Sequence, residues 1–180
     1  MSTPSPTVAP AEGRLGVLTV GLGAVASTLI AGVELAKRGL GAPIGSLAQM
    51  DTIRLGKRTD NRNPMIKDFV PLARLEDIVW GAWDPFPDDA YVAATRAGVL
   101  ESGKHLEAIS DTLREIRPMK AAFERNYVKN IDAENIMGKI SKREMLNAIR
   151  ADINKFRDEK KVDRVVMIWC ASTEIFIEPG

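Results

Sequence analysis

The longest uncharged stretch of the chain lies near its beginning, from Leu15 to Val33. A membrane-spanning helix needs about 20 mainly apolar residues, and this stretch is of that length. Glycines and hydroxyl-bearing residues interrupt it, however, and a glycine weakens a helix interior by about 1 kcal/mol relative to alanine. The preceding segment carries no basic residue before Arg14, whereas a signal peptide begins with a positive region. A membrane-spanning helix and a signal peptide are therefore both disfavoured.

Within this stretch the pattern changes from that of a strand to that of a helix. Residues 15–20 form a short apolar run, typical of a strand buried on both faces. From Val25 onwards, apolar residues recur at helical spacing, and Gly39 is suited to end a helix in a left-handed conformation. The sequence therefore predicts a strand, a glycine turn and a helix over residues 15–38.

Apolar runs predict further strands along the chain. A short strand is expected at Ile78–Trp80, and a buried strand at Arg164–Cys170. The loop-like region between the first helix and Ile78 has room for one short strand, around Gly45–Met50.

Helical patterns separate these strands. Asp88 is the predicted N-cap of a helix that runs to about Ala97. A capping box at Ser141–Glu144 opens a long helix. Two apolar helix faces are expected to be buried: Leu106, Ile109, Leu113 and Ile116, followed by Pro118, and later Met145, Ile149, Ile153 and Phe156.

Strands that alternate with amphipathic helices predict an α/β fold, a Rossmann-type doubly wound parallel sheet. Residues 1–13, rich in Pro, Ser and Thr, are expected to be a disordered tail, and residues 14–180 a single domain. Ligands of such sheets bind beyond the carboxyl ends of the strands. Three predicted strand ends, GLGAVAS, GAWD and CASTE, carry small residues or an acid there. A ligand site is therefore expected where these ends meet.

Composition narrows the function classes. The net charge of +1 gives no electrostatic reason to expect nucleic acid or an anionic membrane as a partner. With one cysteine, Cys170, and one histidine, an internal disulfide and a Cys/His metal site are excluded. A cytoplasmic protein without a metal is expected. Arg54, Lys57, Arg58 and Arg62 either face a phosphate or belong to a solvated loop, and the second interpretation is favoured.

The turn after the first strand, G-L-G-A-V-A, matches the G-x-G-x-x-A form of the dinucleotide-binding fingerprint. Gly21 would allow the tight turn, Gly23 would let a pyrophosphate approach the backbone, and Ala26 would allow close helix–strand packing. Backbone N–H groups at the helix start would hold the phosphates. A purely structural βα turn is the alternative. By spacing alone, Asp51 lies where a simple dehydrogenase has its ribose-binding acid.

Three segments together resemble the myo-inositol-phosphate synthase (inositol-3-phosphate synthase) family: GLGAVAST, GAWDPFPDDAYVAATRAGVL and VVMIWCASTE. TIRLGKR and IRPMKAAFERNYVKNI are similar to a bacterial branch of it, and the resemblance extends over about residues 14–178. It implies a Rossmann-type NAD-binding domain, which in the family is joined to a second α/β region that carries catalysis and tetramer contacts.

The resemblance also implies which residues surround the cofactor. Asp84 matches the acid that binds the adenosine ribose, in place of Asp51, and an acid there favours NAD over NADP. The turn C-A-S-T stands where eukaryotic members have T-A-N-T, so Ser172 replaces an asparagine but keeps a hydrogen-bonding group. The implied cofactor-binding residues are Gly21, Leu22, Gly23, Ala24, Val25, Ala26, Asp84, Ala171, Ser172 and Thr173.

Enzymes of this family convert glucose 6-phosphate to inositol phosphate through oxidation at C5, an aldol closure and reduction of the ketone, in a route to inositol and phospholipids. The resemblance implies that this chain supplies the NAD-binding part of such a homotetrameric isomerase. The family's catalytic lysines match no position up to Gly180, so catalytic residues are not assigned and the chain alone is expected to be inactive. An NAD(P)-dependent dehydrogenase and a non-catalytic NAD-binding fragment are the alternatives.

Overall fold

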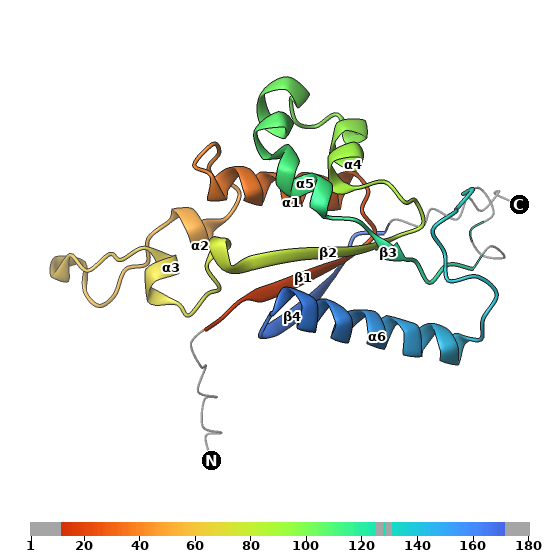
Figure 1. Ribbon diagram of the computed structural model, residues 1–180. Coiled ribbons are helices and arrows are strands. Elements are labelled where there is room, and N and C mark those ends of the chain that lie inside the picture. Colours follow the sequence, from red (N-terminus) through yellow and green to blue (C-terminus); the bar gives the residue numbers. More distant parts are fainter. Residues whose placement is uncertain (1–11, 125–127, 129–130, 172–180) are drawn as a thin grey trace, which may run out of the picture.

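The computed structural model describes residues 12–124, 128 and 131–171. Within them, parallel strands form a four-stranded sheet in the order β3-β2-β1-β4 (Figure 1). The strands are β1 (Leu15–Val20), β2 (Ile78–Asp84), β3 (Met119–Lys120) and β4 (Arg164–Trp169). This order is that of the first four strands of a Rossmann sheet, which confirms the predicted fold class. Most of the predicted N-terminal tail lies outside the described residues.

Helices cover both faces of the sheet, as a doubly wound fold requires. α1 (Ala24–Lys37), α4 (Ala90–Ala97) and α5 (Ser110–Glu115) lie on one face, and α6 (Lys142–Lys160) lies along the other (Figure 1). Shorter helical turns complete the chain: α2 (Leu47–Met50), η1 (Arg58–Asp60), α3 (Ile66–Phe69), η2 (Leu75–Asp77), η3 (Ser102–Leu106) and η4 (Glu107–Ile109). None of the helices in the described residues is long and apolar enough to cross a membrane.

The larger hydrophobic cluster lies between the sheet and the α1–α4–α5 layer. Val17, Trp80 and Ala82 contribute from the strands, and Ile30 from α1. The predicted apolar face of the helical region after Gly103 is confirmed, because each of its four members is buried: Leu106, Ile109, Leu113 and Ile116. The backbone that carries this face is divided into η3, η4 and α5 rather than forming one regular helix.

A smaller cluster lies between the sheet and α6. Phe156 of α6 packs with Leu18, Trp83 and Val162. Met145, Ile149 and Ile153, which were also predicted to be buried, are only partly buried.

The predicted capping box opens α6. The Ser141 hydroxyl accepts the Glu144 N–H at 3.2 Å, and the Glu144 carboxylate accepts the Ser141 N–H at 2.7 Å. The Ser141 hydroxyl also donates to the Glu144 carboxylate, at 2.7 Å, and the hydrogen bonds from the Ser141 N–H and hydroxyl lower the pKa of Glu144.

Two local predictions are wrong. The segment around Gly45–Met50 contains the short helix α2 instead of a strand. The N-cap of α4 is Asp89, which accepts the Val92 N–H at 3.0 Å, and not Asp88, whose carboxylate lies 2.8 Å from the Arg96 guanidinium. Adjacent acids of equal capping propensity cannot be told apart until the backbone fixes the first helical turn.

The strand predicted at Arg164–Cys170 is present as β4, but its predicted burial is wrong. Met167 is 54% exposed and Trp169 is 72% exposed. β4 is an edge strand, paired with β1 alone among the described residues. An apolar run is buried only where neighbouring elements cover it, and those covering β4 reach only its first residues.

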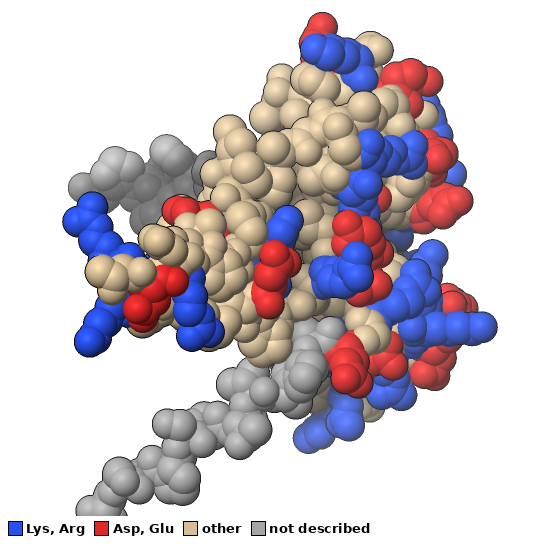
Figure 2. Space-filling model, turned by 90° about the vertical axis from the view of Figure 1, so that its left-hand side faces the viewer, with Lys and Arg blue, Asp and Glu red and all other residues tan. Residues whose placement is uncertain are grey.

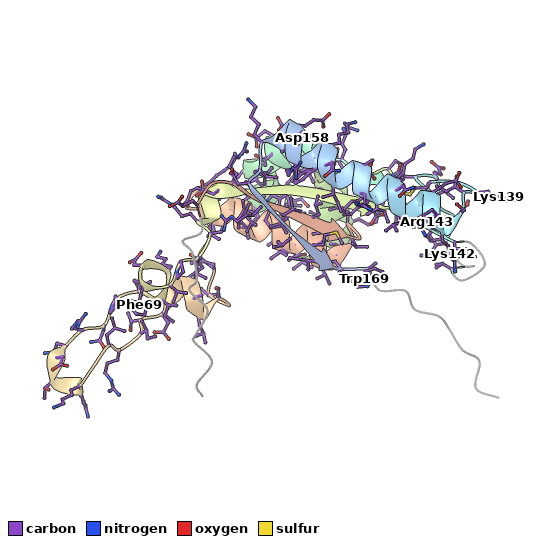
Figure 3. The ribbon with its side chains drawn as sticks, turned by 90° about the horizontal axis from the view of Figure 1, so that it is seen from below. Phe69, Lys139, Lys142, Arg143, Asp158 and Trp169 are labelled. Carbon is purple, nitrogen blue, oxygen red and sulfur yellow. The ribbon has the colours of Figure 1, made fainter. Side chains whose placement is uncertain are left out.

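Residues 44–70 form an arm at the amino end of the strands, opposite the glycine turn (Figures 1 and 3). Its two sides are joined by antiparallel hydrogen bonds, from Ile53 N–H to Pro64 O and from Leu55 N–H to Arg62 O, both 2.9 Å. From the side of the arm, Lys and Arg side chains are seen mixed with Asp and Glu (Figure 2). Because the arm lies opposite the glycine turn, its basic residues between 54 and 62 are far from the predicted phosphate site. This agrees with the solvated-loop interpretation.

Candidate functional site

The glycine turn between β1 and α1 depends on Gly21. Its φ is +97°, a value that side-chain-bearing residues rarely adopt. A Cβ here would lie 2.9 Å from the Ala171 backbone nitrogen. The Gly21 N–H donates to the Trp83 carbonyl at 2.8 Å, which ties the turn to β2. The predicted need for glycine in this turn is confirmed, on steric grounds that involve no ligand.

Gly23 differs from Gly21 because its conformation does not require glycine. It is the N-cap of α1, with an ordinary φ of −77°. A Cβ at this position would meet nothing within 4 Å. The backbone of Gly23 therefore faces open space, which a second molecule can enter.

The start of α1 has no capping side chain. Gly23 offers no side-chain hydrogen bond, and the first turn contains no acidic residue. The first N–H groups of a helix lack partners within the helix, and they carry the positive end of its dipole. Together with the open space at Gly23, these N–H groups can bind an anionic group such as a phosphate.

Asp84, the last residue of β2, is bonded to the glycine turn. Its Oδ2 accepts the Leu22 N–H at 2.6 Å, and its Oδ1 accepts the Phe86 N–H at 2.9 Å. Each carboxylate oxygen has two lone pairs, so Asp84 can accept further hydrogen bonds from hydroxyl groups. Asp51 lies instead at the base of the arm, where it accepts the Thr52 N–H at 2.7 Å. The structure thus brings Asp84, and not Asp51, to the turn.

A cavity of about 740 Å³ opens at the carboxyl ends of β1, β2 and β4. The predicted meeting of the three strand ends is confirmed as far as Ala171. The cavity is lined by these predicted site residues: Gly21, Leu22, Gly23, Ala24, Asp84 and Ala171. Val25 is 69% exposed and Ala26 is fully buried, and neither lines the cavity. Ser172 and Thr173 lie outside the described residues.

The remaining walls are mainly apolar. Large apolar side chains come from segments far apart in the sequence: Phe86, Phe123, Val128, Ile131, Ile149, Met167 and Trp169. Besides Asp84, the charged lining residues are Asp88, Arg96 and Glu124. Arg96, a cation, is paired with Asp88 at 2.8 Å. Such a cavity suits a ligand with large unsaturated rings and a few polar groups.

The sequence did not identify the wall that follows β3. Residues 121–124 line the cavity, yet the sequence patterns assigned no strand, helix or site to them. They contain no motif that spacing alone connects with a ligand. Their one signal was that IRPMKAAFERNYVKNI belongs to a segment shared with the family.

Cys170 lies beside the glycine turn and donates its N–H to the Val20 carbonyl at 2.9 Å. Burial raises the pKa of its thiol, so the thiol is protonated at neutral pH and is a poor nucleophile. Among the described residues no group of three or more His, Cys, Asp or Glu side chains is placed to hold a metal ion.

The family model, the similar sequences and the similar structure all indicate one family. The family model for myo-inositol-1-phosphate synthase matches residues 15–180, and the matching model describes an NAD-binding domain. An inositol-3-phosphate synthase 1 from Bacteroides thetaiotaomicron is 46% identical over an alignment of 171 positions, which covers 94% of this chain and 39% of that protein. An inositol-3-phosphate synthase from Trypanosoma brucei is 29% identical over an alignment of 181 positions, which covers 92% of this chain and 34% of that protein.

A solved structure shares the fold. The crystal structure of inositol-3-phosphate synthase from Caenorhabditis elegans matches 90% of this chain with a TM-score of 0.78 and 27% sequence identity. The match covers 35% of that protein. The chain thus spans less than two fifths of the length of these relatives.

Proposed function

The chain belongs to the myo-inositol-1-phosphate synthase family, and we propose that it binds NAD at the carboxyl ends of β1, β2 and β4. One observation carries this proposal: the same cavity is lined by the open backbone of Gly23 and by Asp84 with its carboxylate. The first can accept the pyrophosphate of a dinucleotide and the second its ribose hydroxyls. A purely structural turn needs Gly21 but has no use for glycine at position 23.

The residues of the cavity fit NAD in three respects. The uncapped start of α1 suits the pyrophosphate, with Gly23 and Ala24, which line the cavity, offering N–H groups. Asp84 suits the adenosine ribose, and its negative charge disfavours the additional phosphate of NADP. The apolar walls suit the two rings. Ala171, Ser172 and Thr173 are proposed to lie along the nicotinamide side, on the strength of the family resemblance.

We further propose that the chain acts as the NAD-binding part of an inositol-3-phosphate synthase, which isomerises glucose 6-phosphate to inositol phosphate. NAD supplies the internal oxidation and the later reduction in that reaction. The residues of this chain bind and orient the cofactor and exclude water from its rings. The chain by itself is expected to bind NAD without turnover, and a homotetramer is proposed for the complete enzyme, both from the family resemblance.

Binding of NAD by calorimetry tests the proposal, with Gly23→Val and Asp84→Ala as variants. Gly23→Val should abolish measurable binding because its side chain would occupy the space in front of the turn. Asp84→Ala should weaken binding about tenfold or more, since a hydrogen bond to a charged group contributes about 1.5–3 kcal/mol. Gly32→Ala is the matched control, because Gly32 lies in the same helix and a Cβ there also meets nothing within 4 Å.

Gly32→Ala should bind NAD as the unmodified chain does. A folded, unmodified chain that does not bind NAD would contradict the proposal for this chain. Equal affinity of the unmodified chain and Gly23→Val would reduce the glycine motif to a structural turn. NADH accumulation by the complete enzyme with a reducing substrate would instead favour the dehydrogenase alternative.

A further inference from the structure

The geometry points to Asn135 as a positioning residue of the proposed NAD site: its side-chain amide holds the carboxyl end of β2 against β3 and so fixes the backbone that carries Asp84. The inference rests on the proposed function, since the site it serves is the NAD site. Neither the glycine motif nor the family resemblance drew attention to Asn135. It lies in the segment of the chain that connects β3 with α6.

The Asn135 side chain meets three backbone carbonyls. Its Nδ2 lies 2.9 Å from the Asp84 oxygen and 3.1 Å from the Met119 oxygen. The Pro118 oxygen is more distant, at 3.4 Å. An amide NH₂ has two hydrogens to donate, so it can bond the two closer carbonyls at the same time. One side chain thus joins the last residue of β2 to the first residue of β3.

The backbone of Asn135 strengthens the same junction. Its N–H donates to the Pro85 carbonyl at 2.9 Å, and its carbonyl accepts the Ala121 N–H at 2.9 Å. Next to it, Ile136 forms a parallel bridge with Ala121, and the Met137 N–H donates to the Ala121 carbonyl at 3.1 Å. The segment therefore extends the sheet just beyond β3, where Ala121 begins the cavity wall.

Asp84 is consequently held from two directions. The Asn135 amide donates to the Asp84 backbone carbonyl, and the Asp84 carboxylate accepts the Leu22 N–H of the glycine turn. A carboxylate can serve a ribose only if its backbone is fixed, because a displacement of about 1 Å weakens a directed hydrogen bond. Without the amide, the Asp84 and Met119 carbonyls lose a donor, and β3 with its following wall is freer to separate from β2.

Asn135 lies away from the parts of the molecule that supply most of the hydrophobic stability. It is half-buried and belongs to neither hydrophobic cluster. The larger cluster involves β1, β2 and the α1–α4–α5 layer, and Asn135 is neither among its members nor among the residues packed against it. Loss of the side chain should therefore affect NAD affinity more than it affects unfolding of the whole domain.

The test is NAD binding by calorimetry, together with thermal unfolding, of the 180-residue chain and its Asn135→Ala variant. We expect the dissociation constant for NAD to rise about tenfold, which corresponds to the net contribution of one hydrogen bond. Asn154→Ala is the matched control, because Asn154 is exposed on α6. It should leave NAD affinity unchanged. Asn135→Ser, which offers a hydroxyl donor in place of the amide, should recover part of the affinity, and it serves as the second variant if Asn135→Ala does not fold.

A double-mutant cycle separates positioning from a general structural role. If Asn135 acts through Asp84, Asn135→Ala should weaken NAD binding much less in an Asp84→Ala background than in the unmodified chain. Equal losses in the two backgrounds, or unchanged affinity of Asn135→Ala and Asn135→Ser, would overturn the inference while the proposed function stands. Absence of NAD binding by the folded, unmodified chain would overturn both.

Discussion

Strands β1 and β4 are both apolar runs but have very different surroundings. Each has six residues and an apolar run, LGVLTV in β1 and RVVMIW in β4, and they pair in parallel with Leu18 opposite Met167. Yet Leu18 is fully buried while Met167 is 54% exposed. β1 has strands on both sides and helices over both faces. β4 has β1 on one side, and its last four residues, 166–169, are exposed. An apolar run therefore predicts a strand, whereas burial depends on the neighbours.

The difference extends to the site. The end of β1 is bound to β2 twice, through the Gly21 N–H to the Trp83 carbonyl and the Leu22 N–H to the Asp84 carboxylate. The end of β4 contacts the turn through the Cys170 N–H to the Val20 carbonyl and through the close approach of Ala171 to Gly21. The interior strand thus provides the fixed part of the candidate cofactor site, and the edge strand provides one wall.

The largest expected effect comes from the register pair Leu18 and Met167. Leu18→Ala should lower the free energy of unfolding by about 2–5 kcal/mol, because it leaves a cavity in a closed core. Met167→Ala should lower it by less than about 1 kcal/mol, because water already reaches this side chain. Urea denaturation of both variants measures the difference. Similar losses would mean that β4 is as closed as β1.

A second variant tests how tightly α6 packs on β1. A Cβ at Gly16 would lie 2.6 Å from Phe156 Cε1 and 3.0 Å from Val162 Cγ2. Gly16→Ala should therefore destabilise the domain by about 1–3 kcal/mol through overpacking. Phe156→Leu combined with Gly16→Ala should be more stable than the sum of the single changes predicts. Strict additivity in denaturation experiments would show that the ring does not limit this position.

A third variant weakens the helix that covers β1 and leaves the strands unchanged. Ser141→Ala should lower the free energy of unfolding by about 1 kcal/mol, the usual cost of losing an N-cap. The Glu144 carboxylate accepts hydrogen bonds from the Ser141 backbone N–H and from the Ser141 hydroxyl, and both lower its pKa; the variant removes the hydroxyl bond. The stability that this bond adds is present above the ordinary pKa of glutamate. It is lost as the pH falls through the lowered value. The variant should accordingly lose less stability than the unmodified chain does on acidification, as measured by thermal unfolding against pH.

The smallest effect is expected on β4 itself. Val166→Thr, at an exposed position of the edge strand, should change the free energy of unfolding by no more than about 0.5 kcal/mol. It should also reduce self-association at high protein concentration, because unpaired apolar edges favour aggregation. Sedimentation analysis measures the association. A loss of stability comparable to that of Leu18→Ala would contradict the contrast between the two strands.

Local features of this protein were determined by the sequence alone. The strand, turn and helix over residues 15–37, the capping box at Ser141 and the apolar face from Leu106 to Ile116 depend on residues close together in the chain. Spacing, capping chemistry and the lack of a side chain at Gly21 act over a few residues and need no distant partner. The family motifs added the expectation of NAD, which the family model supports.

Only the tertiary structure decided which distant residues meet. It placed Asp84 on the turn, through a hydrogen bond to a residue 62 positions earlier, and left Asp51 in the arm. It exposed β4, and it brought Asn135 to the end of β2, 51 positions from Asp84. Spacing along the chain cannot decide such contacts, because they depend on the order of strands in the sheet and on what packs beside each one.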